Sequence, residues 1–407
     1  MSDTKAGSTH PVVFLLLCTP FGAANGYLIV TLAYQLAHAG VSVEAIAGLI
    51  AISLIPQVWK ALWAPIVDTT LSSKTWYLMS ALVSAATLAA IGLFHPSQTT
   101  LFIITVLIFA NSVSISFLAM AAENLMAHAT EESEKGRAGG WYQAGNLGGQ
   151  GIGGGAALWL AQAYPSLMWL PGAAMAALFL ACCAALFFVA EPAMDHRKHN
   201  YLASLWAVVG DVWITAKSRA GFLALLICFL PIGSGAATGL WASIAGDWHA
   251  TADTVALVNG VMGGIVSAAG SVIGGYICDR MDRQFAYALF GVFLAAAALF
   301  MAVSARSQSM FIAFTLLYAF VQGFNYASFS AVVLEAIGRG AAATKYNLYA
   351  ALSNAPIAYM TYFEGRAYSA WHANGLLGAD ALSGIIGVAL FSMVALLLWP
   401  RRVAAPA

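Results

Sequence analysis

Long apolar stretches recur along the whole chain, and they constrain the fold more strongly than any other feature of the sequence. A helix needs roughly 20 largely apolar residues to cross a bilayer. Only 8% of the residues are charged, against about a quarter in soluble domains. Lipid offers no hydrogen-bond partner to exposed backbone groups, so each stretch is expected to be helical. The sequence therefore predicts an all-α membrane protein.

Twelve transmembrane helices are predicted, near 11–37, 43–67, 75–95, 99–125, 138–163, 166–190, 219–246, 252–279, 284–304, 308–336, 342–369 and 378–400. The longest polar stretch follows the sixth span and includes the charged run from Asp195 to His199. It divides the chain into a six-helix bundle at 1–190, a cytoplasmic linker at 191–218 and a second six-helix bundle at 219–407. No cleavable signal peptide is predicted, because the first apolar run continues into a full span.

The positive residues are distributed unevenly over the predicted loops. Of the 17 Lys and Arg residues, all except Lys60, Arg306 and Arg366 fall in the tails or in loops on the side of the N-terminus. Lys and Arg are enriched in cytoplasmic loops of membrane proteins. Both termini are therefore expected in the cytoplasm. The net charge of zero gives no reason to expect a nucleic-acid partner.

Sorting the polar residues by span reveals a repeat of three helices. The third, sixth, ninth and twelfth spans have no Asn, Gln or charged residue in their apolar interiors, and they are expected to face lipid. The other spans carry amides, which are costly in hydrocarbon and should face one another or a wet cavity. The predicted solute-binding residues are Asn25, Asn111, Tyr142, Asn146, Gln150, Gln322, Asn325, Tyr349 and Asn354. The glycines of the fifth span equally permit close helix packing.

A charged motif follows the eighth predicted span. Its spacing is GxxxDRxxR, from Gly275 to Arg283, and the corresponding place after the second span keeps only the acid, Asp68. The motif resembles the cytoplasmic-loop signature of the major facilitator superfamily, which is repeated in both halves. That resemblance implies two pseudo-symmetric six-helix bundles that give alternating access to a central site. It implies a carrier rather than an enzyme.

Such a loop can act as a closing device. An acid at a helix end can pair with Arg and with the positive N-terminus of a neighbouring helix. By the resemblance, the gate residues would be Asp68, Asp279, Arg280 and Arg283, and Glu364 and Arg366 near the predicted outer mouth are candidates for an outer gate. The alternative is that these charges only orient short loops or lie at the membrane interface.

A second resemblance narrows the family. The segment WKALWAPIVD at 59–68 resembles the second-helix signature of the muropeptide permease and acetyl-CoA transporter branch, known as AmpG-like. Segments 136–160 and 343–348 agree with that branch. The resemblance implies a proton-driven importer in a bacterial-type inner membrane, with a muropeptide as solute. A siderophore importer of the same branch is the alternative.

Proton coupling needs a carboxylate that changes its hydration. Glu123, near the cytoplasmic end of the fourth span, is the predicted proton carrier, and Lys60 on the second span is its predicted counter-charge. A group that is buried in one state and hydrated in another can take up and release a proton. A static Glu–Lys ion pair is the alternative.

Two other classes of membrane protein are weaker candidates. An enzyme would need a convergent catalytic set, and a channel would need a continuous polar lining. The sequence has no phosphate-cradling loop, and its five cysteines lack metal-site spacing. The expected partners are a small solute, a proton and the lipid bilayer. No cofactor and no obligate protein partner are predicted, and a monomer is expected.

Overall fold

The computed structural model describes residues 9–41, 43–191, 201–338 and 342–398, and these residues form helices without a single strand. Eight helices within these ranges are long and apolar enough to cross a membrane. The last of them, which ends at Leu397, holds two passes, because its backbone leaves the helical conformation at Trp371 and His372. Three further passes are α3, the continuous run from α6 to α7, and the broken run from α10 to η6. The result is the predicted twelve-helix architecture.

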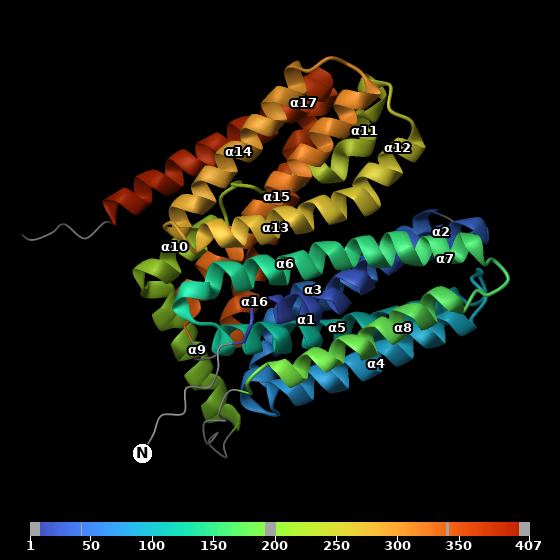
Figure 1. The fold of residues 1–407 in the computed structure, drawn as a ribbon, viewed down its shortest axis with the longest axis horizontal. Helices are drawn as coiled ribbons and strands as arrows, with labels where there is room; N and C mark the ends of the chain where they lie inside the picture. Colours follow the sequence, from blue (N-terminus) through green and yellow to red (C-terminus); the bar gives the residue numbers. More distant parts are fainter. Residues whose placement is uncertain (1–8, 42, 192–200, 339–341, 399–407) are drawn as a thin grey trace, which may run out of the picture.

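The first six passes form the N-terminal bundle, which Figure 1 shows in blue and green. Its elements are α1 Val12–Gly26, η1 Tyr27–Leu32, α2 Ala33–His38, α3 Val43–Thr69, α4 Ser73–Leu93, α5 Leu101–Ala129, η2 Glu132–Glu134, α6 Lys135–Gly151, η3 Ile152–Ala156, α7 Ala157–Ala163, α8 Leu170–Cys182 and η4 Cys183–Phe188. Serine caps help the short connections to turn. The hydroxyl of Ser72, for example, accepts from the backbone N–H of Thr75 at the start of α4.

The second six passes form the C-terminal bundle, in yellow-green to red. Its elements are α10 Arg219–Ile227, η5 Ala236–Leu240, α11 Trp241–Ile244, η6 Ala245–Trp248, α12 Ala252–Leu257, η7 Val258–Met262, α13 Gly263–Cys278, α14 Arg283–Val303, α15 Gln308–Ile337, α16 Ala342–Leu352 and α17 Asn354–Leu397. The seventh pass breaks at Pro231–Gly235, where one proline and two glycines interrupt the helix. Gly233 and Gly235 adopt positive φ angles of 63° and 67° there, which residues with a Cβ rarely tolerate.

The predicted linker is not only a loop. Its second part forms the helix α9, Tyr201–Lys217, which lies beside α10 and α3. Trp206 and Trp213 on this helix are 75% and 62% exposed. The charged run 195–199 lies outside the described residues. The end of the molecule that carries α9, Asp68 and Asp279 is called the linker face below, and the opposite end is called the far face.

The two bundles share apolar clusters at the linker face and have separate cores toward the far face. The larger shared cluster contains Phe14, Tyr142, Phe329 and Tyr346, which come from both halves. A smaller one joins Ala64 to Ala343. A second cluster lies wholly between Ala23 and Phe179, and a third lies wholly in the C-terminal bundle. In Figure 1 the bundles accordingly converge toward the linker face and diverge toward the far face. The described structure is therefore closed at the linker face.

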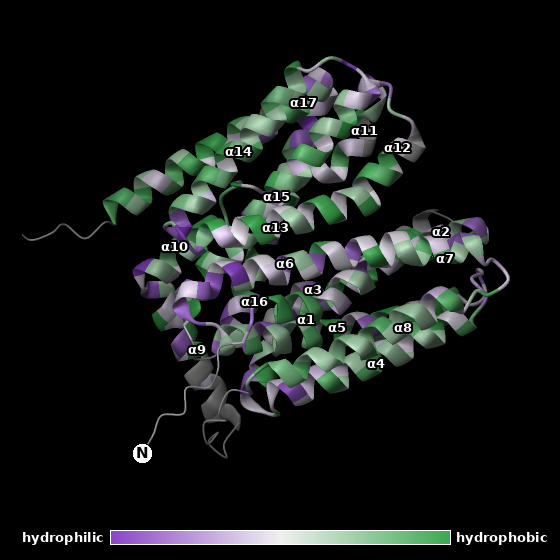
Figure 2. Cartoon of the chain, viewed as in Figure 1, coloured by the Kyte–Doolittle hydropathy of each residue, from purple (hydrophilic) through white to green (hydrophobic). Residues whose placement is uncertain are grey.

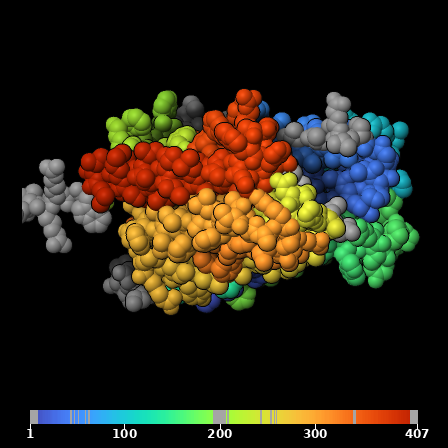
Figure 3. Space-filling model, turned by 90° about the horizontal axis from the view of Figure 1, so that it is seen from above, coloured from blue at the N-terminus to red at the C-terminus, as the bar shows by residue number. Residues whose placement is uncertain are grey.

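Hydropathy follows this arrangement. In Figure 2, green apolar residues dominate the outer helices α4, α8, α14 and α17, and purple residues gather at the two ends of the molecule. Figure 3 looks onto the C-terminal bundle, where α17 lies beside α14. One expectation was wrong here. The twelfth span does contain a charged residue, Asp380, which is only 6% exposed and points into the bundle.

Candidate functional site

Glu123 is the centre of a buried polar network between the two bundles. It lies on α5 and is 3% exposed. The Tyr142 hydroxyl of α6 donates to Glu123 Oε1 at 3.0 Å, and Asn347 Nδ2 of α16 donates to Oε2 at 2.6 Å. Lys60 Nζ of α3 lies 4.0 Å from Oε1. Three helices of the N-terminal bundle and one helix of the C-terminal bundle thus meet at a single carboxylate.

The network continues along α6. Gln143 Nε2 and the Tyr346 hydroxyl both lie 2.9 Å from Ser330 Oγ on α15, so a second polar contact joins the bundles. Asn146 Nδ2 donates to Gln143 Oε1 at 3.3 Å, and Gln150 Nε2 donates to Asn146 Oδ1 at 3.3 Å. The predicted amides therefore form a chain that runs from the buried network to the exposed Gln150.

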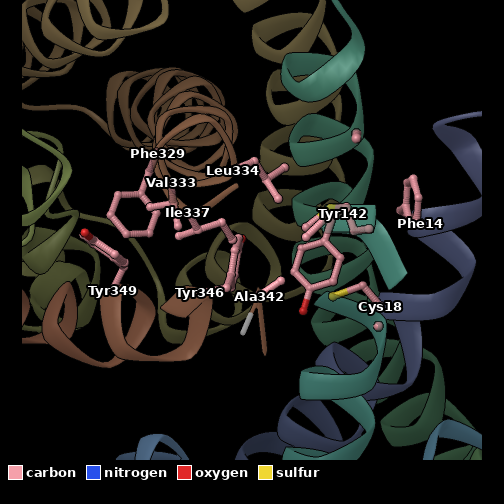
Figure 4. Close-up of a cluster of buried hydrophobic side chains, with 14 of the residues drawn as sticks. Phe14, Cys18, Tyr142, Phe329, Val333, Leu334, Ile337, Ala342, Tyr346 and Tyr349 are labelled. Atoms are coloured by element: carbon pink, nitrogen blue, oxygen red, sulfur yellow. The ribbon is translucent and has the colours of Figure 1, made fainter. Parts of the chain in front are cut away.

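Apolar side chains surround this network. Figure 4 shows Tyr142 between Cys18 of α1 on one side and Ala342 and Tyr346 of α16 on the other. The rings of Tyr142 and Tyr346 meet edge to face, with centroids 6.3 Å apart. A buried charge is tolerated only when it is paired and hydrogen-bonded. The apolar surroundings therefore make the contacts of Glu123 with Lys60, Tyr142 and Asn347 essential to its placement.

Asp68 caps a helix of the opposite bundle. Its Oδ1 accepts from the backbone N–H of Ala343 at 3.2 Å, and its Oδ2 accepts from the N–H of Thr344 at 2.8 Å and from its hydroxyl at 2.6 Å. These donors belong to the first turn of α16. The first N–H groups of a helix lack intrahelical partners and carry partial positive charge. The carboxylate of one half thereby satisfies a helix start of the other half.

Asp279 makes the same contact in the reverse direction. Its carboxylate accepts from the backbone N–H groups of Gly136 and Arg137 at 2.7 and 3.0 Å, which begin α6. Arg137 Nε also donates to Oδ2 at 2.8 Å. A Cβ on Gly136 would lie 2.6 Å from Asp279 Oδ1, so only glycine permits this approach. The two predicted gate acids are therefore equivalent helix caps across the interface.

The remaining charges of the motif have different surroundings. Arg283 Nη1 lies 2.8 Å from Glu132 Oε1 and 3.2 Å from Glu335 Oε2, so it bridges the bundles. Burial alone would raise the pKa of Glu132, but hydrogen bonds from Lys135 and Arg283 outweigh it and place the pKa below its ordinary value. Arg280 is exposed and forms no ion pair within the described ranges. Asp282 caps α14 by accepting from the N–H of Phe285 at 2.8 Å.

Two pockets lie at equivalent places in the two bundles. The C-terminal pocket, about 460 Å³ including its open mouth, is lined by Ser234, Tyr287, Asn325, Tyr326 and Asn354 together with apolar residues. The N-terminal pocket, about 300 Å³ by the same measure, is lined by Asn25, Asn111 and Ser112 together with apolar residues. Neither lining contains a charged side chain.

The amides of Asn111 and Asn325 have corresponding roles in the two halves. Asn111 Nδ2 donates to Ser84 O and Thr87 Oγ1 of α4, at 3.3 and 3.1 Å. Asn325 Nδ2 donates to Phe290 O of α14 at 3.2 Å. Both amino groups therefore fix the third helix of a repeat rather than point at solute. Asn325 Oδ1 remains buried without a hydrogen-bond partner and is available as an acceptor.

The other predicted site residues are dispersed. Asn25 and Asn354 line the two pockets. Asn25 donates to Phe21 O of its own helix, and Asn354 donates to Ala350 O of the preceding helix α16. Gln322 is 8% exposed and contacts the broken seventh pass, because a Cβ on Gly235 would lie 1.7 Å from its Nε2. Tyr349 is 2% exposed and donates to Gly221 O at 3.0 Å, which is a packing contact.

The candidates for an outer gate do not lie together. Arg366 is exposed, whereas Glu364 is fully buried within the C-terminal bundle, where it interacts with Asp380. Sequence reasoning missed three polar residues that the structure places at these sites, namely Asn347, Tyr318 and Asp380. For Asp380 a signal existed, because an acid inside an apolar run is by default a functional candidate. The described residues contain no group of His, Cys, Asp and Glu that could hold a metal ion.

Comparison with known proteins agrees with this geometry. The family model described as the Major Facilitator Superfamily matches residues 12–361. A search of curated proteins finds no match. The fucose:proton symporter FucP of E. coli has a TM-score of 0.69 at 18% identity over 95% of this chain and 98% of that one. The human organic anion transporter MFSD10 has a TM-score of 0.69 at 16% identity over 93% and 98%.

A third solved structure, the proton:xylose symporter XylE, has a TM-score of 0.64 at 12% identity over 96% of this chain and 95% of that one. These identities are low, so the structures establish the shared fold only. The family match covers most of the chain, and the twelve passes and paired helix caps fit it. The protein belongs to the major facilitator superfamily and is a multi-pass membrane transporter.

Proposed function

We propose that the protein is a proton-coupled importer of a small solute whose recognised part is uncharged and carries hydroxyl and amide groups. The observation that supports this most is Glu123, whose carboxylate accepts hydrogen bonds from both bundles while Lys60 balances its charge. Protonation would remove the attraction to Lys60 and weaken the charge-assisted bond from Asn347. A proton on Glu123 would therefore change the contact that holds the two halves together.

In this proposal, the described conformation is the outward-facing state of an alternating-access cycle. The linker face lies on the cytoplasmic side of a bacterial-type inner membrane. Three kinds of contact support closure at that face: the Asp68 cap, the Asp279 cap and the Arg283 bridge. To release solute inward, the protein must break all three and must also separate Asn347 from Glu123. Binding energy from solute and proton would shift the equilibrium toward that inward-facing state.

The solute class follows from the pockets. The C-terminal pocket offers Asn325 Oδ1 as a free acceptor, tyrosine and phenylalanine rings and no charge. Aromatic faces and amides together suit sugar-like groups. Among solutes of the AmpG-like branch, the sugar part of an anhydro-muropeptide fits this lining better than a charged metal complex. We therefore place a muropeptide first and a siderophore second.

Uptake into proteoliposomes tests this proposal. Proteoliposomes contain wild type, Glu123→Gln or the exposed control Glu131→Gln. They receive a labelled anhydro-muropeptide with and without an inwardly directed proton gradient. Wild type and the control should accumulate the solute only when the gradient is present. Glu123→Gln should still exchange solute across the membrane but should not accumulate it, because the amide cannot carry a proton.

The outcomes separate the parts of the proposal. Full gradient dependence in Glu123→Gln would remove Glu123 from the coupling role. Competition by unlabelled siderophore but not by muropeptide would favour the alternative solute. If uptake of either solute is independent of the gradient in wild type, proton coupling itself is wrong.

A further inference from the structure

Two acids meet inside the C-terminal bundle, away from Glu123. They lie on the two arms of α17, which fold back on each other at Trp371 and His372. Glu364 and Asp380 stand at equal sequence distance on either side of His372. Gly375 allows the arms to come close, since a Cβ there would lie 2.4 Å from Ala367 O. The hairpin therefore brings the two carboxyl groups into one place.

Both side chains are shielded from solvent. Glu364 is 0% exposed, and Asp380 is 6% exposed. The Tyr318 hydroxyl of α15 donates to Asp380 Oδ2 at 3.0 Å, and the ring of Tyr318 is held edge-on by Trp241 with centroids 5.2 Å apart. Among the residues that the structure describes, none donates a hydrogen bond to either carboxyl oxygen of Glu364. Its polar neighbour is the carboxyl group of Asp380, and a hydrogen bond can form between the two groups only when one of them is protonated.

No cation among the described residues balances these acids. The ion pairs in this part of the chain involve Arg283, Lys345 and their partners at the linker face. In the loop before α15, Arg306 lies 3.8 Å from the centroid of the Trp248 ring and donates to Asn374 Oδ1. Arg366 is exposed. Within the described part of the bundle, the positive charges are thus engaged elsewhere or turned away.

The other titratable groups on the elements packed against the pair are also accounted for. On α14 and α15, Tyr287 donates to Ile232 O, Tyr326 contacts Gln322 and Glu335 pairs with Arg283. At the end of α10, Cys228 donates to Ala224 O and Tyr349 O, and Arg219 is the first residue of that helix. On α16, Tyr346 bonds to Ser330 and Tyr349 bonds to Gly221. On α17 itself, Tyr359 donates to Phe229 O, Tyr362 is 63% exposed, and the rings of Tyr368 and His372 lie 6.0 Å apart. The segment η5, which also contacts α17, has no titratable residue. Tyr318 is therefore the donor that faces the pair.

We propose that Glu364 and Asp380 form a second proton-binding site, in which one proton is shared between the two carboxyl groups. Two like charges in a dry site cannot both persist, so a close pair of carboxyls retains a proton. The shared proton supplies the donor that Glu364 lacks. Three oxygen-bearing side chains are few for a hard cation, which takes six or more oxygen ligands when it is Ca²⁺. A proton therefore suits this site better than a metal ion.

Infrared spectroscopy of the purified full-length protein in lipid tests the site directly. Wild type should show the carbonyl band of a buried protonated carboxyl group at a pH where exposed carboxyls are ionised. Glu364→Gln and Asp380→Asn should each lose this band, while Glu131→Gln should keep it. Both amide variants preserve shape and can still donate to the remaining acid, so the hairpin should stay folded.

Tyr318→Phe provides a variant that keeps both acids. Removal of its hydrogen bond should shift the band without abolishing it. A spectrum of Glu364→Gln identical to that of wild type would overturn the proposal. Loss of the wild-type band when sodium chloride replaces choline chloride at constant pH would also overturn it, because the site would then bind sodium. The band does not depend on solute uptake, so failure of the transport proposal would leave this result unaffected.

Discussion

The two contacts between the bundles at the linker face share a capping acid but differ in packing. Where Asp279 caps α6, close approaches continue between the run from α6 to η3 and the run from η7 to α13. They extend from the Gly136–Gly275 contact to Gly155, where a Cβ would lie 2.2 Å from Val261. Where Asp68 caps α16, α3 contacts a helix that ends at Leu352. Asp279 thus caps the end of a long, close helix contact, whereas Asp68 caps the end of a short one.

The difference shows which features are duplicated and which are added. Both halves keep a carboxylate that accepts two backbone N–H groups of the opposite bundle. Among the described residues, only the capping acid of α6 also forms an ion pair, between Arg137 and Asp279. On the α16 side, Lys345 pairs with Asp211 of the linker helix α9 instead, at 2.9 Å. Helix capping is therefore the common element of closure, and the charges around it are specific to each side.

The largest effect is expected where glycine sets the helix distance. In Gly140→Ala, the new Cβ would lie 2.5 Å from Ser271 O, so α6 and α13 must separate. Overpacking of this kind costs about 1–3 kcal/mol, and solute uptake should fall about tenfold or more. The matched control is Gly148→Ala, whose Cβ would meet Ala268 Cβ at an ordinary 3.6 Å and should leave uptake unchanged. Equal losses in both variants would show that α6 and α13 do not need this close contact.

Uptake should differ between variants of the two capping acids by a smaller factor than between the two glycine variants. Hydrogen bonds to charged groups contribute about 1.5–3 kcal/mol each. Asp279→Asn loses the charge in both the cap and the Arg137 ion pair, whereas Asp68→Asn loses it in the cap only. Uptake should therefore fall in both variants and further in Asp279→Asn.

Cys278 reports on the same closure. Its side chain is 1% exposed at the end of α13, beside the Asp279 cap. With the other four cysteines replaced by serine, maleimide labelling of Cys278 should be slow in wild type and faster in Asp279→Asn. A greater loss of uptake in Asp68→Asn, together with unchanged Cys278 labelling in Asp279→Asn, would contradict the comparison.

Much of this arrangement follows from the sequence, because it depends on periodicity and charge. The spans, the break at Pro231–Gly235 and the nearness of Lys60 to Glu123 are of this kind. Contacts between distant segments are not encoded locally. Asn347 meets Glu123 across 224 positions of chain, and no local pattern marks it. Asp380 was overlooked because one acid scarcely changes the hydropathy of an apolar run.

The smallest effect is expected at the Arg283 bridge. The side chain of Glu132 is 69% exposed, and such pairs contribute about 0.2–1 kcal/mol, which salt screens. Arg283→Gln should raise Cys278 labelling by no more than about fivefold. The pKa of Glu132 is lowered in the closed state, so the bridge contributes above the ordinary carboxyl pKa and is lost as the pH falls through the lowered value.

The ratio of labelling rates between Arg283→Gln and wild type should therefore stay constant from mildly acidic to mildly alkaline pH. It should approach one only under strongly acidic conditions. A ratio that changes steeply around neutral pH would show that another group controls this bridge.

The central claim is that solute and proton cross together because Glu123 joins the two bundles. It is tested most directly by adding anhydro-muropeptide to proteoliposomes without an imposed gradient and recording the external pH. Wild type should alkalinise the medium in proportion to solute entry, and Glu123→Gln should not. Solute entry by wild type without any movement of protons would contradict the account.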